Sequence, residues 1–293
     1  MKVYLSGATG FVGSHVAREL REQGAEVRDE RIDLLDRDGL DHAVEGCDAV
    51  VHVAALYSYD APEADFERVN VEGTRTLLAA ALGRGVRRFV FTSTGGTCGP
   101  VPGRIATEED EPPEWELSVP YKRTKLEAER LAVAAGAVVV NPTTPVGDGD
   151  SKPTPTGRMI EGVATGRIRA YVGTTGLNVV DVRDVARGHA LALERGLARE
   201  RYLLGGVNLP LEDLFAAIAD LAGRPRPRLR VPYPVAEAAA KAGFANAEEV
   251  KLARIPMYFS SDKARSTLGY EPGPVEPALA RATAEAVKRK GGA

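Results

Sequence analysis

The chain has 293 residues, 44% of them hydrophobic, and its 38 basic and 41 acidic side chains leave a formal net charge of -3. That size suffices for one large buried core, or for one core with a smaller lobe, and the near balance of charge gives no reason to expect nucleic acid or an anionic membrane as partner. Because no segment has the apolar length of a membrane span, and because Cys47 and Cys98 lack the spacing of metal ligands, we expect a cytoplasmic protein without a metal site or a disulfide.

Apolar runs alternate with stretches of helical period through the first half of the chain. The predicted strands and helices, in chain order, are 3–5, 12–23, 49–54, 67–83, 88–92, 121–135 and 137–140, of which the second, fourth and sixth are helices. An alternation of this kind is typical of an α/β protein whose parallel sheet is covered by helices on both faces. We therefore predict a Rossmann-type, doubly wound parallel sheet.

The second half of the chain is less regular. Residues 147–157 are rich in Gly, Pro, Asp, Ser and Thr, which predicts a long loop that leaves the sheet. The run 179–184 predicts a return to the sheet. Further helices are predicted at 185–193, 211–221 and 276–288.

This pattern predicts two parts of unequal size. The first is a domain over 1–150 whose sheet is completed by about 176–205. The second is a smaller C-terminal lobe formed by 151–175 and 206–293, where we expect a substrate to bind.

A turn of small residues, Gly7-Ala8-Thr9-Gly10-Phe11-Val12-Gly13, joins the first predicted strand to the first predicted helix. Small residues let the backbone approach a pyrophosphate, and the free N–H groups at a helix start favour its negative charge. The glycines are spaced three and three, unlike those of the commonest dinucleotide motif. The evidence for a nucleotide site is therefore the position of the turn between a strand and a helix. We therefore predict a dinucleotide-binding first domain, with Gly7, Thr9, Gly10, Phe11, Val12 and Gly13 against the cofactor.

Three side chains further along suit proton transfer at a carbonyl oxygen. Tyr121 and Lys125 are four residues apart, on one face of a predicted helix. A nearby ammonium stabilises a phenolate and lowers the pKa of a tyrosine from about 10. Thr94 follows a predicted strand at the edge where ligands of parallel sheets bind, so its hydroxyl can hold the same oxygen, with Ser93 as the alternative. An exposed Tyr and Lys are the other interpretation, but the glycine turn favours a catalytic set of Thr94, Tyr121 and Lys125.

With these residues the chain resembles the extended short-chain dehydrogenase/reductase superfamily, from Lys2 to about Gly206. The resemblance is carried by GATGFVG at 7–13, DLLD at 33–36, VVHVAA at 50–55, NVEGT at 70–74, FTSTGGTCG at 91–99, YKRTK at 121–125 and NPTTPVG at 141–147. The superfamily includes NAD-dependent epimerase/dehydratases and dihydroflavonol-reductase-like enzymes. Within it, the segments 152–160 and 170–180 are similar to the hopanoid-associated sugar epimerase group.

The resemblance implies further contacts to the cofactor. Asp33 and Leu34 would face the adenine, and Ala54 and Ala55 would pass close to the cofactor. Pro142 and Thr143 would lie near the nicotinamide, and the expected set is completed by Val53, Thr92, Tyr121 and Lys125. Dimers of the superfamily commonly form through the helices that are 67–83 and 121–135 here, which implies a homodimer as one option.

The choice of cofactor depends on an unusually short second crossover. Only Asp29, Glu30 and Arg31 separate the predicted second strand, which ends at Arg28, from Ile32, so we expect a bare loop or a trimmed crossover. Arg28 and Arg31 can meet a 2′-phosphate, whereas Asp29 or Glu30 in the same space would accept hydrogen bonds from ribose hydroxyls. Of the two cofactors we favour NADP(H) over NAD.

These residues favour an NAD(P)H-dependent reductase that converts a ketone or aldehyde of a small molecule to an alcohol. Tyr121 would donate the proton, Thr94 would orient the oxygen and Lys125 would poise the tyrosine. The residues expected around the substrate are Tyr57, Thr94, Gly95, Trp115, Tyr121 and Met159.

Two other functions stay open. One is a nucleotide-sugar epimerase or dehydratase with tightly bound NAD, and the other is a non-catalytic NAD(P)-sensing protein. Against the first, residues 141–145 lack the arginines of the sugar-nucleotide enzymes, which leaves Arg158, Arg167 and Arg169 as candidates to hold a diphosphate.

Overall fold

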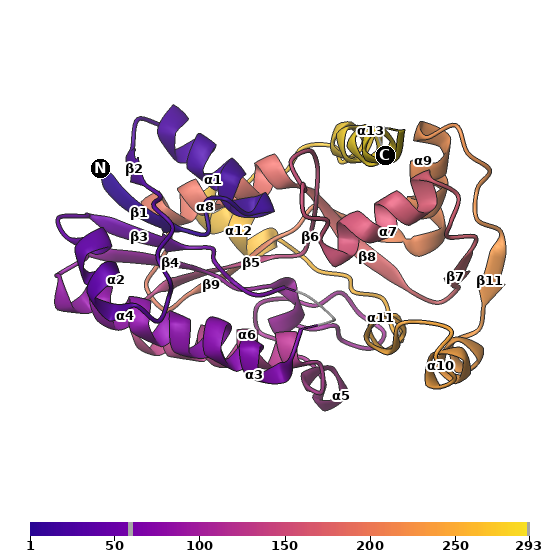
Figure 1. The fold of residues 1–293 in the computed structure, drawn as a ribbon, viewed down its shortest axis with the longest axis horizontal. Coiled ribbons are helices and arrows are strands. Elements are labelled where there is room, and N and C mark those ends of the chain that lie inside the picture. The colour runs from indigo at the N-terminus through magenta and orange to yellow at the C-terminus, as the bar shows by residue number, and fades with distance from the viewer. Residues whose placement is uncertain (58–60, 292–293) are drawn as a thin grey trace.

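A six-stranded sheet forms the larger part of the molecule in the computed structural model, which describes residues 1–57 and 61–291 (Figure 1). Its strand order is β2-β1-β3-β4-β5-β9, and every neighbouring pair is parallel. The strands are β1 (Lys2–Ser6), β2 (Glu26–Arg28), β3 (Ala49–His52), β4 (Arg88–Thr92), β5 (Val138–Pro142) and β9 (Arg201–Leu204). The predicted Rossmann-type parallel sheet is therefore confirmed. The strand order reverses between β1 and β3, where ligands of such sheets bind.

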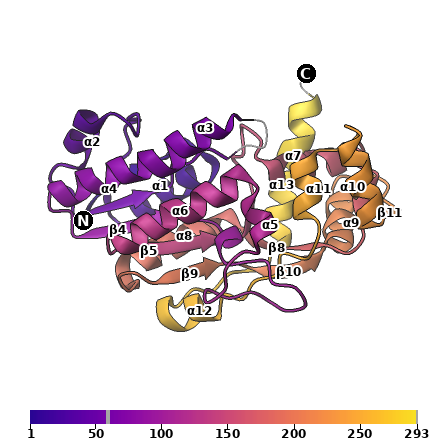
Figure 2. The same cartoon turned by 90° about the horizontal axis from the view of Figure 1, so that it is seen from below.

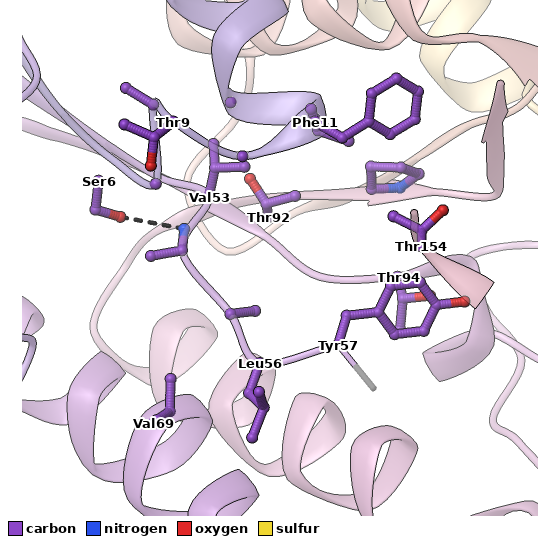
Figure 3. Close-up of a pocket in the computed structure, with 18 of the residues that line it drawn as sticks. Ser6, Thr9, Phe11, Val53, Leu56, Tyr57, Val69, Thr92, Thr94 and Thr154 are labelled. Atoms are coloured by element: carbon purple, nitrogen blue, oxygen red, sulfur yellow. Dashed lines mark hydrogen bonds between the residues drawn. The ribbon is translucent and has the colours of Figure 1, made fainter. Parts of the chain in front are cut away.

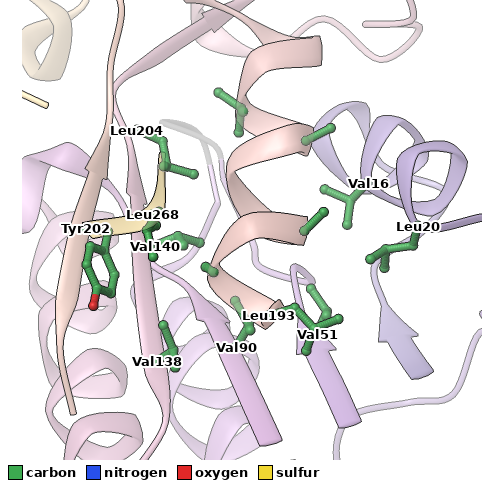
Figure 4. Close-up of a cluster of buried hydrophobic side chains, with 14 of the residues drawn as sticks. Val16, Leu20, Val51, Val90, Val138, Val140, Leu193, Tyr202, Leu204 and Leu268 are labelled. Carbon is green, nitrogen blue, oxygen red and sulfur yellow. The ribbon is translucent and has the colours of Figure 1, made fainter. Parts of the chain in front are cut away.

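Helices cover both faces of this sheet (Figures 1 and 2). One face carries α1 (Phe11–Glu22), α8 (Val182–Arg195) and α12 (Asp262–Leu268), and the other carries α2 (Arg37–Val44), α4 (Gly73–Gly83) and α6 (Pro120–Ala134). Because side chains alternate along a strand, Val3 and Leu5 pack under α1 and α8, whereas Tyr4 packs under α2 and α4. Figure 4 shows the first of these cores, where Leu193 of α8 lies near Val51 and Val90 of the sheet and Val16 of α1 lies on the other side of α8.

A second hydrophobic core lies beyond the carboxyl edge of the sheet. It packs α7 (Pro155–Ala164), α9 (Leu211–Leu221) and α13 (Glu276–Gly291) around Ile160, Phe215 and Leu279. A three-stranded sheet supports it, in the order β10 (Val207–Pro210), β8 (Gly176–Asp181), β6 (Thr144–Val146). The remaining elements are α3 (Glu63–Phe66), a π-helical turn (Glu67–Glu72), a 3₁₀ turn (Gly95–Thr97), α5 (Glu114–Leu117), β7 (Ala170–Val172), β11 (Leu229–Val231), α10 (Tyr233–Lys241) and α11 (Ala247–Leu252). Within the described residues, we find no helix that is both long and apolar enough to cross a bilayer.

Two expectations about the fold are corrected. Of the two alternatives for the second crossover, the bare loop is wrong, because the eight-residue helix α2 forms in it: the Asp36 carboxylate accepts a hydrogen bond from the Gly39 N–H at 3.0 Å and caps the helix. The run 179–184 does not return to the main sheet. The edge beside β5 is occupied by β9, so β8 pairs with β6 and β10 instead.

Two histidines are buried against the main sheet and connect it to the helices on either face. His52 lies within hydrogen-bond distance of Ser6 Oγ at 2.6 Å and Thr74 Oγ1 at 3.0 Å. His189 of α8 contacts the Val185 carbonyl at 2.8 Å through Nδ1 and Thr92 Oγ1 at 2.9 Å through Nε2. Burial lowers the pKa of His52 to about 3 and that of His189 to about 4, and the charge of Lys125 contributes to the shift at His52.

We predict that the protein loses stability between pH 7 and pH 5. The unfolded chain protonates these histidines near pH 6.5, whereas the folded chain keeps them neutral, so the free energy of unfolding falls by about 2 kcal/mol per histidine at pH 5. Urea denaturation at the two pH values measures this loss. The loss should be smaller in His189→Gln than in wild type, and as large as wild type when the exposed His42 is replaced in the same way. An equal loss of stability in His189→Gln and wild type would contradict the inference that the folded protein keeps His189 neutral.

Candidate active site

A cleft of about 540 Å³ lies at the carboxyl edge of the main sheet (Figure 3). Four neighbouring strands each lead into the cleft through a residue that lines it: Gly7 follows β1, Ala54 follows β3, Thr94 follows β4 and Thr143 follows β5. The cleft therefore occupies the point at which the strand order reverses.

The glycine turn forms one wall of the cleft, and two of its positions exclude any side chain. Gly7 has a φ of +80°, and a Cβ there would lie 2.5 Å from the backbone nitrogen of Ala54. A Cβ on Gly13 would lie 2.0 Å from the carbonyl oxygen of Gly7. Helix α1 follows with Gly10 as its N-cap, and no side chain of the described residues caps it. The helix N-terminus therefore offers unpaired N–H groups to the cleft, which fits the pyrophosphate of a dinucleotide.

Helix α6 brings Tyr121 and Lys125 to the same cleft, and the loop after β4 brings Thr94. Thr94, Tyr121 and Lys125 all line it. The Lys125 ammonium donates a hydrogen bond of 2.6 Å to the carbonyl of Thr92 and lies 4.3 Å from the centre of the Phe91 ring. Ser93 also lines the cleft, but its Oγ lies 3.3 Å from the hydroxyl of Thr97. The described residues contain no group of three or more His, Cys, Asp or Glu side chains able to hold a metal ion.

Burial governs the protonation of Tyr121 and Lys125. It raises the pKa of Tyr121 well above its usual value, Tyr57 adds to the rise, and a hydrogen bond with Thr94 opposes it. The rings of Tyr57 and Tyr121 lie with centroids 4.5 Å apart. Burial also lowers the pKa of Lys125 to about 7, against the charge of Glu129. Tyr121 therefore holds its proton at neutral pH, as a proton donor must, while Lys125 titrates near neutrality.

The structure brings most of the predicted cofactor residues to the cleft. Besides the glycine turn, those that line it are Arg31, Leu34, Val53, Ala54, Ala55, Thr92, Tyr121, Lys125, Pro142 and Thr143. Asp33 is not among the lining residues; its carboxylate accepts a hydrogen bond from the Leu35 N–H at 3.0 Å.

Arg28 is placed away from the cleft. Its guanidinium donates to the carbonyls of His42, Ala43 and Glu45 at the C-terminal end of α2, at 3.1–3.4 Å. The expectation that Arg28 meets a 2′-phosphate does not fit this geometry, because the free carbonyls of a helix end hold the cation elsewhere. Asp29 and Glu30 line the cleft beside Arg31, and Asp29 pairs with Arg21 at 2.7 Å.

The predicted substrate residues divide into two groups. Tyr57, Thr94 and Tyr121 line the cleft. Gly95, Trp115 and Met159 are absent from the described lining: Gly95 is packed against Thr143 and Phe259, Trp115 lies under the guanidinium of Arg254 at 5.4 Å, and Met159 packs against the second core.

Several lining residues are not predictable from the sequence. They are Tyr4, Ser6, Ala8, Ile32, Leu56, Val69, Pro145, Lys152, Thr154 and Thr156. The last three come from the Gly- and Pro-rich segment 147–157, and Figure 3 shows Thr154 at the end of the cleft that also holds Thr94 and Tyr57. The composition of that segment indicated a loop but did not tell which of its side chains turn inward.

Comparisons with known proteins show the family to which the chain belongs. The family model described as "NAD dependent epimerase/dehydratase family" matches residues 3–205. The chain is 36% identical to a putative dihydroflavonol 4-reductase of Synechocystis sp., over 95% of this chain and 92% of the relative.

Solved structures show the same fold along the whole chain. The crystal structure of gox2253 is 39% identical, with a TM-score of 0.86 over 98% of each chain. The structure of PA4631, named a nucleoside-diphosphate-sugar epimerase of Pseudomonas aeruginosa, is 27% identical, with a TM-score of 0.83 over 99% of this chain and 98% of the other.

The resemblance found in the sequence is thus confirmed. The chain belongs to the NAD dependent epimerase/dehydratase family, within the extended short-chain dehydrogenase/reductase superfamily of NAD(P)-dependent enzymes.

Proposed function

We propose that this enzyme is an NAD(P)H-dependent reductase that converts a ketone or aldehyde of a small molecule to an alcohol. The observation that carries the proposal is the place of Tyr121. It holds its proton at neutral pH, lines one cleft with Thr94 and Lys125, and shares that cleft with the uncapped N-terminus of α1. These features fit a proton donor at one end and a pyrophosphate site at the other.

In this proposal a bound nicotinamide supplies the hydride, and the residues of the chain manage the oxygen. The Thr94 hydroxyl donates a hydrogen bond to the carbonyl oxygen and holds it near Tyr121. Tyr121 gives its Oη proton to that oxygen as the carbon is reduced, so that the product is an alcohol. The Lys125 ammonium, which α6 places one turn further on, stabilises the phenolate that remains.

The cations around the cleft favour a substrate without a diphosphate. Among the described residues that line it, the cationic ones are Arg31, Lys125 and Lys152. A diphosphate prefers the bidentate fork of arginine. The three arginines considered for this role are engaged elsewhere: Arg158 with the Pro153 carbonyl, Arg167 with Glu161 and Arg169 with the Gly166 carbonyl.

The relatives leave two candidate reactions. The name of the Synechocystis relative, a putative dihydroflavonol 4-reductase, supports the reductase. The name of the Pseudomonas structure supports the second candidate, an epimerase or dehydratase of a nucleotide sugar with tightly bound NAD. Membership of an enzyme family speaks against a non-catalytic NAD(P) sensor. A homodimer through α4 and α6, and a substrate-binding role for the C-terminal lobe, stay predictions.

We propose NADP(H) as the cofactor on the basis of Arg31. This side chain lines the cleft beside Leu34 and Glu30, whereas the carboxylate of Asp29 pairs with Arg21. The Arg31 guanidinium suits a 2′-phosphate, and Glu30 is the neighbour that would favour ribose hydroxyls instead.

Replacing the proton donor tests the proposed reaction. Tyr121→Phe should lower kcat for any carbonyl compound that the wild type reduces by about 100-fold or more, because the transferred proton is lost. The rate is followed as NADPH oxidation over a panel of ketones and aldehydes, and NADPH binding by calorimetry should change little. Tyr233→Phe, on α10, is the matched control and should keep its rate. A Tyr121→Phe enzyme with an undiminished rate would sink the proposal.

Replacing Arg31 tests the proposed cofactor. Arg31→Ala should weaken NADPH binding about tenfold or more and leave NADH binding nearly unchanged, because only NADPH loses a charge-assisted hydrogen bond. Calorimetric titration of both nucleotides measures the difference. Arg75→Ala, which removes a surface arginine of α4 paired with Glu72, should affect neither. Equal weakening of the two nucleotides would mean that Arg31 does not read the 2′-phosphate.

A further inference from the structure

A buried carboxylate lies directly behind the proposed catalytic residues. Glu129 stands on α6 one turn after Lys125, and only 2% of it is exposed. One carboxylate oxygen accepts hydrogen bonds from Thr97 Oγ1 at 2.7 Å and from the amide nitrogen of Asn141 at 2.8 Å. The other oxygen lies 3.0 Å from Nε of Arg201 on β9. Glu129 therefore connects α6 to the ends of β4, β5 and β9.

Two of these partners also hold the backbone of Thr94. The Thr97 hydroxyl lies 2.8 Å from the Thr94 carbonyl oxygen, and the Asn141 amide nitrogen lies 3.2 Å from the same atom. Thr97 and Asn141 further contact each other at 2.9 Å. Because Thr97 gives its single hydroxyl hydrogen to Glu129, the Thr94 carbonyl accepts from the Asn141 amide and from the Thr97 backbone N–H at 3.1 Å. Glu129 in turn holds both of these residues by their side chains. A carbonyl fixed in this way fixes the backbone of Thr94, and the Thr94 Oγ1 also accepts a hydrogen bond from the Gly96 N–H at 3.2 Å, which restrains its direction.

The Glu129 carboxylate also affects the pKa of Lys125. The buried ammonium is near the neutral His52 of β3, and it lies on α6 between Tyr121, one turn before, and Glu129, one turn further on. Of these groups, Glu129 supplies the negative charge that raises the pKa of Lys125 against burial. Arg201 in turn lies against Glu129, Cys98 and Glu108. Arg201 is therefore shared among three partners, and its ion pair offsets only part of the negative charge of Glu129.

We propose that Glu129 is a positioning residue of the active site, which fixes the Thr94 loop through Thr97 and Asn141 and provides the counter-charge of Lys125. The inference rests on the proposed reductase function for its catalytic meaning. Neither effect requires Glu129 to touch a substrate or a cofactor. The two effects are separable, because Thr97 takes part in the first and carries no charge for the second.

Two variants and one control separate these effects. Glu129→Gln keeps the shape but removes the charge, Thr97→Val removes a hydroxyl but no charge, and Glu127→Gln changes an exposed glutamate of the same helix. The pKa of Lys125 is read by NMR of protein labelled with ¹³C at lysine Cε, with Lys125→Met to assign the signal. The mobility of the Thr94 loop is read by amide hydrogen exchange of a peptide that spans 94–98. Both measurements use the whole chain without cofactor or substrate.

We expect the pKa of Lys125 to fall by about one unit or more in Glu129→Gln and to stay unchanged in Thr97→Val and Glu127→Gln. Amide hydrogen exchange in the 94–98 peptide should be faster in Glu129→Gln and in Thr97→Val, and unchanged in Glu127→Gln. For any carbonyl compound that the wild type reduces, kcat should fall in both of them with a smaller change in KM. In Glu129→Gln alone, the alkaline limb of the pH profile should move to lower pH.

An unchanged Lys125 pKa in Glu129→Gln, or unchanged exchange of the 94–98 peptide in Thr97→Val, would overturn the proposal. Should Glu129→Gln not fold, the exchange rate in Thr97→Val still decides it. Failure of the reductase function would look different. Wild-type protein would then reduce no carbonyl compound, while the NMR and exchange results, which need no substrate, would still be as expected.

Discussion

The hydrogen bond from the Lys125 ammonium to the carbonyl of Thr92 joins the two sources of the proposed catalytic residues. Lys125 and Tyr121 belong to α6, whereas Thr94 belongs to the loop after β4. Apolar packing of Ala128 and Ala132 holds α6 against the sheet. The Lys125 contact with Thr92, together with the contacts of Glu129, adds polar links between α6 and the strand ends, which are costly to break because the groups are buried. Tyr121, on the same helix, lines the cleft at that edge.

A second constraint shapes the opposite wall of the cleft. The backbone of Gly7 passes so close to Ala54 and Gly13 that no side chain fits, and α1 consequently starts against the end of β3 with its first N–H groups uncapped. At this wall the close approach of the backbone is possible because glycines leave room for it. At α6, in contrast, the contact between Lys125 and Thr92 is electrostatic. The cleft between the two walls therefore has a positive helix end on one side and a neutral tyrosine beside a titratable lysine on the other.

Much of this arrangement follows from local patterns. The buried strands were predictable as apolar runs, and Tyr121 and Lys125 as neighbours by their helical spacing. Arg28 was misplaced because its true partners, the last carbonyls of α2, exist only once that eight-residue helix has formed. Glu129 carried no signal at all, because its partners Thr97 and Asn141 are 32 and 12 residues away in the chain. Trp115 and Met159 do not line the cleft, and the sequence could not show this because an aromatic or apolar side chain suits a core as well as a cleft.

The nucleotide that the purified protein retains is the measurement that tests the reductase proposal most directly. A reductase must exchange its cofactor in every turnover, whereas an epimerase returns the hydride and keeps it. Denaturing the protein and identifying the released nucleotide by mass spectrometry distinguishes the two. We expect an empty site or substoichiometric NADP(H). One tightly held NAD per chain would contradict the reductase and its proposed cofactor together, and would favour the epimerase.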